Sequence, residues 1–525
     1  MVDQRAVIVA RRAAELAEAM GVVLANDMAL WALAGGRPPA ESVPGRPEEL
    51  GELLESSFDP SARRRQGAHY TPEATATGLV GRALRGCERP SIGDPGCGGG
   101  ALLLAAARHL AAHGEDPADV VGRLWGADVD AVAVATTEVA LTLWAGAPPP
   151  AGRCTVADAL VDDLGWPPLD VVVGNPPFLS QLDAPTTRPP PTTQRLRERF
   201  GPAVRAYTDT SSLFLLLACE LVASGGTAAV LQPQSVLAAR DAAGVRAAVE
   251  ARGRLAEVWF PDGPGFDASV DVCVPIIEVG GSGDGDGWGG HLARANGVPP
   301  VGLSVGRTLA DEATTTAAFR TEYYGMVDHV HEAADRPDGA PLVTTGLIDL
   351  GHCAWGERPA RIGRRPWERP VLDVGALDGR AADWVRRTRV PKLVVATQTR
   401  VVEVAVDETG DWVPGVPLVV VLAPPARLWP LAAALAAPAV SAWLLERVAG
   451  TALTPSSLKV TAALLREVPL PTDDTAWRHG TEALRDGDLA GFVDAMGVAY
   501  GVGVEVTDWW RPRATTVWSR PGMHQ

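Results

Sequence analysis

The stretch LDVVVGNPPFLS, residues 169–180, decides how the middle of this chain folds. Its three consecutive valines suit a strand that is covered on both faces, because unbroken runs of β-branched residues are typical of buried parallel strands. The two prolines that follow end the strand, since proline cannot donate a hydrogen bond to a neighbouring strand. Asn175 is therefore predicted at the carboxyl end of a central strand, which is where open α/β sheets bind ligands.

On both sides of this stretch, apolar strands alternate with helical patterns from about residue 65 to 280. The other strands that we predict read SIGD, LWGADVD, CTVADAL, TAAVLQP, LAEVWFP and VCVPIIEV. The helices read ALLLAAARHLAAHG, AVAVATTEVALTLWAG and SSLFLLLACELVASGG, and the last of them is expected to end at Gly225 and Gly226. This alternation predicts an α/β fold with a Rossmann-like, doubly wound and mostly parallel sheet.

Three regions are predicted along the chain. Residues 1–60 have apolar spacing near 3.6 and form a short helical N-terminal region. Residues 61–280 form the α/β domain, and the glycine-rich segment 280–290 is the best internal boundary. Residues 291–525 form a mixed α+β domain, with a β-rich part and then a helical part.

Bulk properties exclude several classes of protein. The 525 residues contain no run of 18 apolar residues and no apolar core followed by a cleavage site at the start, which predicts neither a membrane span nor a signal peptide. The six scattered cysteines include no CxxC pair, which predicts a reducing cytoplasm and no structural disulfide or metal site. The net charge of −16 argues against non-specific polycation binding, yet residues 351–400 carry eleven Arg or Lys against five Asp or Glu (11 − 5 = +6), a local basic region.

A glycine loop, DPGCGGG at 94–100, joins the predicted strand SIGD to the next helix. Glycines such as Gly96 and Gly98 let the backbone approach a ligand closely, and the helix behind them offers N–H groups and the positive end of its dipole. The loop does not match GxxxxGK[ST], which disfavours an NTPase with a phosphate-binding P-loop, and it departs from the dinucleotide fingerprint GxGxxG. On its own it therefore indicates only a nucleotide-like ligand. The alternative is a flexible turn with no ligand.

Two aspartates follow the next two strands. Asp128 ends the second strand in GADVD, and Asp158 follows the third strand in VADAL. A carboxylate at the end of the second strand can accept hydrogen bonds from ribose hydroxyls, and one after the third strand can meet the exocyclic amine of an adenine. Each aspartate alone is more often a solvated residue or a helix cap.

Taken in order, the motifs DPGCGGG, GADVD, VADAL and GNPPF resemble those of class I S-adenosylmethionine-dependent methyltransferases. The segment RRRQGAHYTPEATATGLVGRAL (63–84) lies ahead of them and resembles the G-x-[FYH]-[FY]-TP segment of DNA adenine-N6 methyltransferases. The order of these motifs is the γ arrangement of restriction–modification and phage-defence enzymes. The chain departs from this family in reading DPGCGGG where many members read DPACGSG.

This resemblance implies S-adenosyl-L-methionine as the cofactor and assigns a role to each motif residue. The cofactor-binding residues that it implies are His69, Tyr70, Thr71 and Pro72 at the methionine end, Asp94, Gly96 and Gly98 as the floor, Asp128 at the ribose, Asp158 at the adenine, and Asn175. The catalytic residues that it implies are Asn175 and Pro176 as acceptors for the target amino group, Pro177 as a rigid support, and Phe178 as a stacking plate for an extruded base.

The resemblance also implies partners. Double-stranded DNA would be the substrate, residues 291–525 the target-recognition domain, and the segment 180–210 a long loop beside the extruded base. A separate specificity subunit or a cognate nuclease of a defence system is the further partner that such enzymes have. Three alternatives stay open: a modification subunit that needs a specificity partner, a methyltransferase for RNA or protein glutamine, and a cofactor-binding subunit without catalysis.

Overall fold

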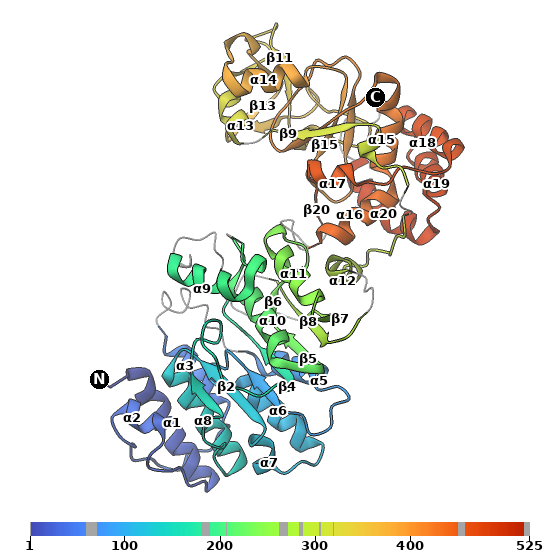
Figure 1. Cartoon of the computed structure of the whole chain (residues 1–525). Helices are drawn as coiled ribbons and strands as arrows, with labels where there is room; N and C mark the ends of the chain where they lie inside the picture. Colours follow the sequence, from blue (N-terminus) through green and yellow to red (C-terminus); the bar gives the residue numbers. More distant parts are fainter. Residues whose placement is uncertain are drawn as a thin grey trace. The chain divides into compact units, whose positions relative to one another are not determined.

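The computed structural model describes residues 2–58, 71–179, 189–205, 207–261, 271–282, 287–303, 306–318, 320–449 and 457–518. The chain forms two compact units, Met1–Asp286 and Gly287–Gln525 (Figure 1). Each has a hydrophobic core of its own. The division between the units lies in the glycine-rich segment 280–290.

The first unit is built around one eight-stranded sheet with the strand order β3-β2-β1-β4-β5-β8-β6, in which β7 also pairs with β8. Strands β1 to β5 are mutually parallel, whereas β6 and β7 pair antiparallel with β8, which itself runs antiparallel to β5. The predicted Rossmann-like, mostly parallel sheet is confirmed. The strands are β1 (Ile92–Asp94), β2 (Leu124–Asp128), β3 (Cys154–Val156), β4 (Leu169–Gly174), β5 (Val222–Val230), β6 (Gln232–Pro233), β7 (Gly253–Trp259) and β8 (Val272–Val279).

Helices cover this sheet, and the N-terminal ones share its core. The helices of the first unit are α1 (Gln4–Met20), α2 (Ala29–Ala34), α3 (Glu49–Ser56), α5 (Glu73–Ala83), α6 (Ala101–Ala112), α7 (Pro117–Val121), α8 (Ala131–Ala145), α9 (Pro190–Phe200), α10 (Thr210–Leu221) and α11 (Ala243–Glu250). Helices α1, α2 and α3 pack against α8, as Figure 1 shows for the blue start of the chain. Buried side chains such as Leu16 and Leu50 therefore belong to the same cluster as Val171 and Val173 of the central strand.

Two local predictions were wrong. The helix expected to end at Gly225 and Gly226 ends at Leu221, because Val222 already adopts an extended conformation and pairs with Leu169 as the start of β5. The segment 180–210, expected to be a long loop, contains the helix α9; residues 180–188 and 206 lie outside the described part. Two prolines open this helix, where the missing N–H costs nothing.

The second unit is a mixed α and β fold, as predicted for this region. It has two four-stranded sheets, ordered β10-β14-β11-β18 and β17-β15-β19-β9, and two two-stranded sheets, β12-β13 and β16-β20. The strands are β9 (Thr314–Ala317), β10 (Val330–Glu332), β11 (Ala340–Val343), β12 (Ala360–Ile362), β13 (Arg365–Trp367), β14 (Pro370–Leu372), β15 (Lys392–Ala396), β16 (Gln398–Thr399), β17 (Val404–Asp407), β18 (Val413–Pro414), β19 (Leu418–Leu422) and β20 (Leu458–Lys459).

Its helices are α12 (Trp288–Ala295), α13 (Arg320–Val327), α14 (Gly379–Thr388), α15 (Leu428–Ala436), α16 (Pro438–Val448), α17 (Ala462–Arg466), α18 (Asp474–Asp486), α19 (Leu489–Tyr500) and α20 (Val504–Trp518). Among the described residues, no single helix has both the length and the apolar composition to cross a membrane. The bent pair 425–436 and 438–448, with 61° between its halves, meets that test only as a pair, and it is largely buried within the unit.

Candidate functional site

A cavity of about 900 Å³ opens in the first unit where the parallel strands end. Its walls include four strand-end aspartates, the glycine loop, and Asn175 and Pro177 of the segment after β4. The N-terminal helices close one side through residues of α1 and α3. The structure therefore brings Asp94 and Asn175 together, which lie 81 residues apart (175 − 94), as the strand-end argument predicts.

The glycine loop forms the floor of this cavity. Its backbone turns back on itself because Gly98 has a φ of +51°, a conformation that a side chain at Cβ disfavours. The amide of Gly96 donates to the Asp94 carboxylate at 3.0 Å, and the amide of Gly98 donates to Asp128 at 3.0 Å. The loop and the two strand ends are thus fixed to one another before any ligand arrives.

Gly99 of the glycine loop packs against a neighbouring helix. A Cβ at this position would lie 2.5 Å from the Cα of Gly51 in α3. The two glycines therefore allow the N-terminal helix α3 to rest directly on the glycine loop, so Gly99 serves helix packing.

Asp94, at the end of β1, is only 1% exposed, and burial raises the pKa of its carboxyl to about 7. Since the folded-state pKa lies above the ordinary value of 3.8, the folded state holds this proton more tightly than the unfolded chain does. The contribution of this bound proton to the free energy of unfolding is fully present below about pH 4 and is lost as the pH rises to about 7.

We therefore expect Asp94→Asn to flatten the decline in the free energy of unfolding between about pH 4 and pH 7. Urea unfolding at several pH values in this window measures the slope. Asp116→Asn is the matched control, because Asp116 is an exposed helix N-cap that asparagine can replace. A slope that Asp94→Asn leaves as steep as in the wild type would contradict this assignment.

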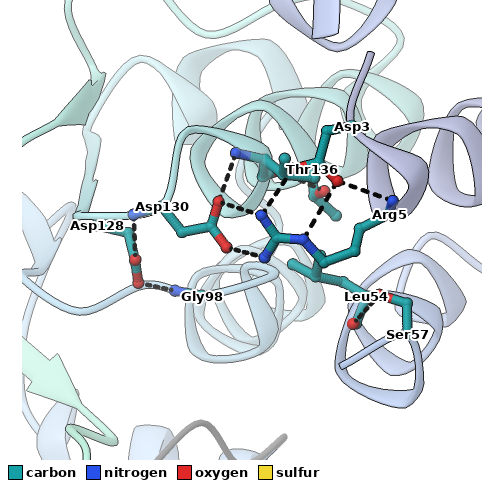
Figure 2. A network of polar contacts seen from close by, with 9 residues as sticks. Asp3, Arg5, Leu54, Ser57, Gly98, Asp128, Asp130 and Thr136 are labelled. Atoms are coloured by element: carbon teal, nitrogen blue, oxygen red, sulfur yellow. Dashed lines mark hydrogen bonds and ion pairs between the residues drawn. The ribbon is translucent and has the colours of Figure 1, made fainter. Parts of the chain in front are cut away.

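The second strand end holds two carboxylates with different partners (Figure 2). Asp128 accepts from the backbone amides of Gly98 and Asp130, at 3.0 and 2.9 Å, and burial raises its pKa. Asp130 caps α8 by accepting from the amide of Val132 at 2.9 Å. It also forms an ion pair with Arg5, which comes from helix α1.

Arg5 is a site residue that the sequence reasoning missed. Its guanidinium contacts both Asp3 and Asp130 (Figure 2). It also lies 4.9 Å from the centre of the Phe58 ring. Among the described residues that line the cavity, Arg5 is the one cation beside five carboxylates. Its only sequence signal is a basic residue near the start of an amphipathic helix, which does not indicate a partner 125 positions away.

We expect Arg5 and Asp130 to be energetically coupled by about 1 kcal/mol in the free energy of unfolding, since residues in direct contact are usually coupled by about 0.5–3 kcal/mol. Their side chains are 26% and 22% exposed, so solvent screens the pair only in part. A double-mutant cycle of Arg5→Ala and Asp130→Asn measures the coupling, because asparagine keeps the helix cap and removes the charge. Additive effects of the two substitutions would show that the ion pair contributes nothing.

Asp158 lines the cavity after β3, beyond Asp128 on the neighbouring strand. Its carboxylate accepts from the amide of Leu160 at 3.1 Å, and burial raises its pKa. It therefore combines a local capping role with a place in the cavity wall.

Asn175 lies directly after β4, as the valine run and prolines predict. Its Nδ2 donates to Oγ1 of Thr71 at 3.0 Å, which fixes the plane of the amide. Thr71 is buried and lines the same cavity, immediately ahead of α5. The TP segment and the NPPF segment therefore meet through a hydrogen bond between residues 104 positions apart.

The remaining predicted residues lie close by. Pro177 lines the cavity, whereas Pro176 is buried and is not among the lining residues. Phe178 is half-buried, packs against the hydrophobic core and is not among the cavity's lining residues. Pro72 caps the start of α5 beside Thr71. His69 and Tyr70 lie outside the described residues.

Residues 49–278 match the family model described as N-6 DNA Methylase. This segment of the chain is similar to the N-6 DNA methylase family. We call it the methylase domain. The resemblance inferred from the motifs is confirmed over this segment, which contains the glycine loop, the strand-end aspartates and Asn175 but not α1 or Arg5.

Solved structures of restriction-modification enzymes resemble the chain. The type IIL restriction-modification enzyme MmeI in complex with DNA shares the fold: it is 13% identical with a TM-score of 0.55, covering 94% of this chain and 81% of that chain. The type IIG restriction endonuclease BpuSI is 12% identical with a TM-score of 0.45, covering 99% and 78%. A type I restriction-modification methyltransferase subunit from Streptococcus thermophilus is 21% identical with a TM-score of 0.33, covering 44% and 49%. No curated protein sequence matches the chain.

Proposed function

We propose that the chain is a site-specific DNA methyltransferase that transfers a methyl group from S-adenosyl-L-methionine to the N6 amino group of adenine. The observation that carries the proposal is the single cavity shared by the glycine loop, the strand-end carboxylates and Asn175. The likeness to MmeI, a restriction-modification enzyme solved with DNA, supports such a role in a restriction–modification or defence system.

The residues of the cavity fit this cofactor. Its volume of about 900 Å³ is ample for a nucleoside with an amino-acid arm, and glycines at its floor leave the backbone accessible. The five carboxylates and one arginine of its described lining suit a ligand that carries a sulfonium and an ammonium group. Asp128 would hold the ribose, Asp158 the adenine, and Thr71 with the Asp94 loop the methionine end. When bound, the cofactor supplies an electrophilic methyl group.

Asn175 and Pro176 would then prepare the target nitrogen. The lone pair of an adenine amino group is delocalised into the ring, so this nitrogen is a poor nucleophile. The Asn175 Oδ1 and the Pro176 carbonyl would accept hydrogen bonds from its two protons and draw the nitrogen toward a tetrahedral geometry. Thr71 holds the amide in place by accepting from Nδ2. Positioning and electrostatic stabilisation of this kind account for much of the rate in other enzymes.

The target base must leave the duplex to reach Asn175. Phe178 is the candidate stacking plate, and its half-buried position directly after the two prolines supports this role. It would need to move from its contact with the core to lie against a base. The second unit would supply target recognition, which makes a separate specificity subunit unnecessary.

Parallel assays of methyl transfer from labelled S-adenosyl-L-methionine to unmethylated DNA, RNA and total protein test the proposal. We expect label in DNA, on adenine N6. Label in RNA or protein alone would assign the alternative substrates. Label in DNA only after addition of a specificity subunit would identify a modification subunit.

A further inference from the structure

The hairpin formed by β12 and β13 in the second unit presents three arginines to solvent. These hairpin arginines are Arg361, Arg364 and Arg365, and all three are exposed. The hairpin itself is anchored, because Ala360 and Ile362 are 4% exposed and belong to the hydrophobic core of the unit. The amide of Gly363 also donates to the hydroxyl of a tyrosine in α13 at 3.0 Å. An anchored element therefore carries exposed cationic side chains.

The turn of this hairpin is unusual for its residues. Ile362 pairs with Arg365, so Gly363 and Arg364 form a two-residue connection. Their φ angles are +58° and +66°, as a type I′ turn requires. Glycine and asparagine adopt this conformation readily, whereas an arginine at the second position is strained. Strain of this kind in a fixed turn indicates that the side chain serves a purpose other than folding.

The side chains of the hairpin arginines have no polar partner within the part of the chain that the structure describes. Of the carboxylates close by in the sequence, Asp349 pairs with Arg358 and Glu357 contacts His352, whereas Glu368 is exposed. The Glu332 carboxylate accepts from two backbone amides just after β13. In a chain of net charge −16, the hairpin thus concentrates three positive charges within residues 361–365.

An exposed aromatic ring lies beside one of these cations, Arg361. Tyr324 of α13 is 68% exposed and lines, together with Arg361, a cavity of about 220 Å³ at the base of the hairpin. Several tryptophans of the basic region are instead used internally: Trp384 is 1% exposed, and Trp355 and Trp367 donate to backbone carbonyls. The aromatic group that this face offers is therefore Tyr324.

We propose that the hairpin arginines, with Tyr324, form a contact surface for duplex DNA. This inference rests on the proposed function and names the element that would hold its substrate. A two-stranded β-ribbon has the width that the major groove admits, and arginine is the residue that most often binds phosphates and guanine edges. The methylase domain in the same chain favours DNA over another polyanion.

The test uses the full-length protein and a fluorescently labelled mixed-sequence duplex, titrated at several salt concentrations. Arg364→Gly is the most informative variant, because glycine suits the turn and the fold should be as stable or more so. We expect it to weaken duplex binding about fivefold or more. We also expect the slope of log K against log salt to fall by about 1 for each phosphate that the variant no longer neutralises. Arg365→Ala should behave in the same way.

Arg485→Ala is the matched control, since Arg485 is exposed in the same unit but contacts Glu408. It should leave the affinity and the salt slope unchanged, and all variants should bind S-adenosyl-L-methionine like the wild type. If the wild type binds and methylates DNA while both hairpin variants match it in affinity and slope, the inference is overturned and the proposed function stands. If the wild type neither binds nor methylates DNA, or binds duplex RNA alone, both are overturned.

Discussion

Replacing Asn175 by alanine is expected to lower the rate of methyl transfer about 10²–10³-fold, the loss that removal of one preorganised polar group usually causes. The variant loses one of the two acceptors that draw the target nitrogen toward a tetrahedral geometry. Cofactor affinity should fall far less than the transfer rate, because the glycine loop and the strand-end carboxylates are held by their own hydrogen bonds. Single-turnover rates at saturating DNA, together with calorimetric titration of S-adenosyl-L-methionine, separate the two effects.

Thr71 provides a graded control for this prediction. Thr71→Ser keeps the hydroxyl that accepts from Asn175 Nδ2 and should transfer methyl groups at close to the wild-type rate. Thr71→Val removes the acceptor, leaves the amide unanchored and should give an intermediate rate. Full activity of Asn175→Ala, or equal rates for the two Thr71 variants, would show that the Asn175 amide does not accept a hydrogen bond from the target amino group as proposed.

A second large effect is expected in the second unit, where Lys392 and Asp407 form a buried ion pair between β15 and β17. The two side chains are 0% and 1% exposed, and burial lowers the pKa of Lys392. Asp407→Ala leaves an ammonium group buried without its counter-charge, so we expect a loss of about 3–5 kcal/mol in the free energy of unfolding. Urea unfolding followed by near-ultraviolet circular dichroism measures this loss.

Lys392→Met should cost less than Asp407→Ala. The Asp407 carboxylate would keep three other donors, namely the amides of Gly410 and Trp412 at 2.8 and 3.0 Å and the hydroxyl of Thr409 at 3.2 Å. Arg511→Ala, which breaks an ion pair whose side chains are 39% and 72% exposed, is the surface control and should cost less than about 1 kcal/mol. Equal losses for Asp407→Ala and this control would contradict the prediction.

The sequence was sufficient to predict the parallel sheet and the residues that collect at its carboxyl edge. The valines of β4 and the prolines after it have local consequences, and parallel strands that end at one edge bring their following residues together whatever their separation in sequence. Asn175, Asp94 and Asp128 follow from this reasoning. The resemblance to the methylase motifs added roles for these residues and one further residue of the cavity wall, Thr71.

Contacts between distant segments could not be predicted, because no periodicity or turn signal specifies them. Arg5 reaches Asp130 across 125 residues, and Lys392 stands out in the sequence only as one of two lysines in an arginine-rich chain. The start of β5 was misplaced for a related reason. An apolar run such as LLLACELVAS suits either a helix or a strand, and only pairing of Val222 with Leu169 fixes where one ends and the other begins.

The packing of α1 on α8 and the place of Arg5 in the cavity wall bear on how much of the chain the cavity needs. The methylase family segment starts at residue 49 and thus excludes α1 and α2, although α1 contributes Arg5 to the cavity wall and packs on α8. A protein trimmed to residues 49–278 would expose apolar faces of α3 and α8 to water and lose the Arg5 guanidinium from the cavity wall. The cavity is therefore built from more of the chain than the segment that matches the family model.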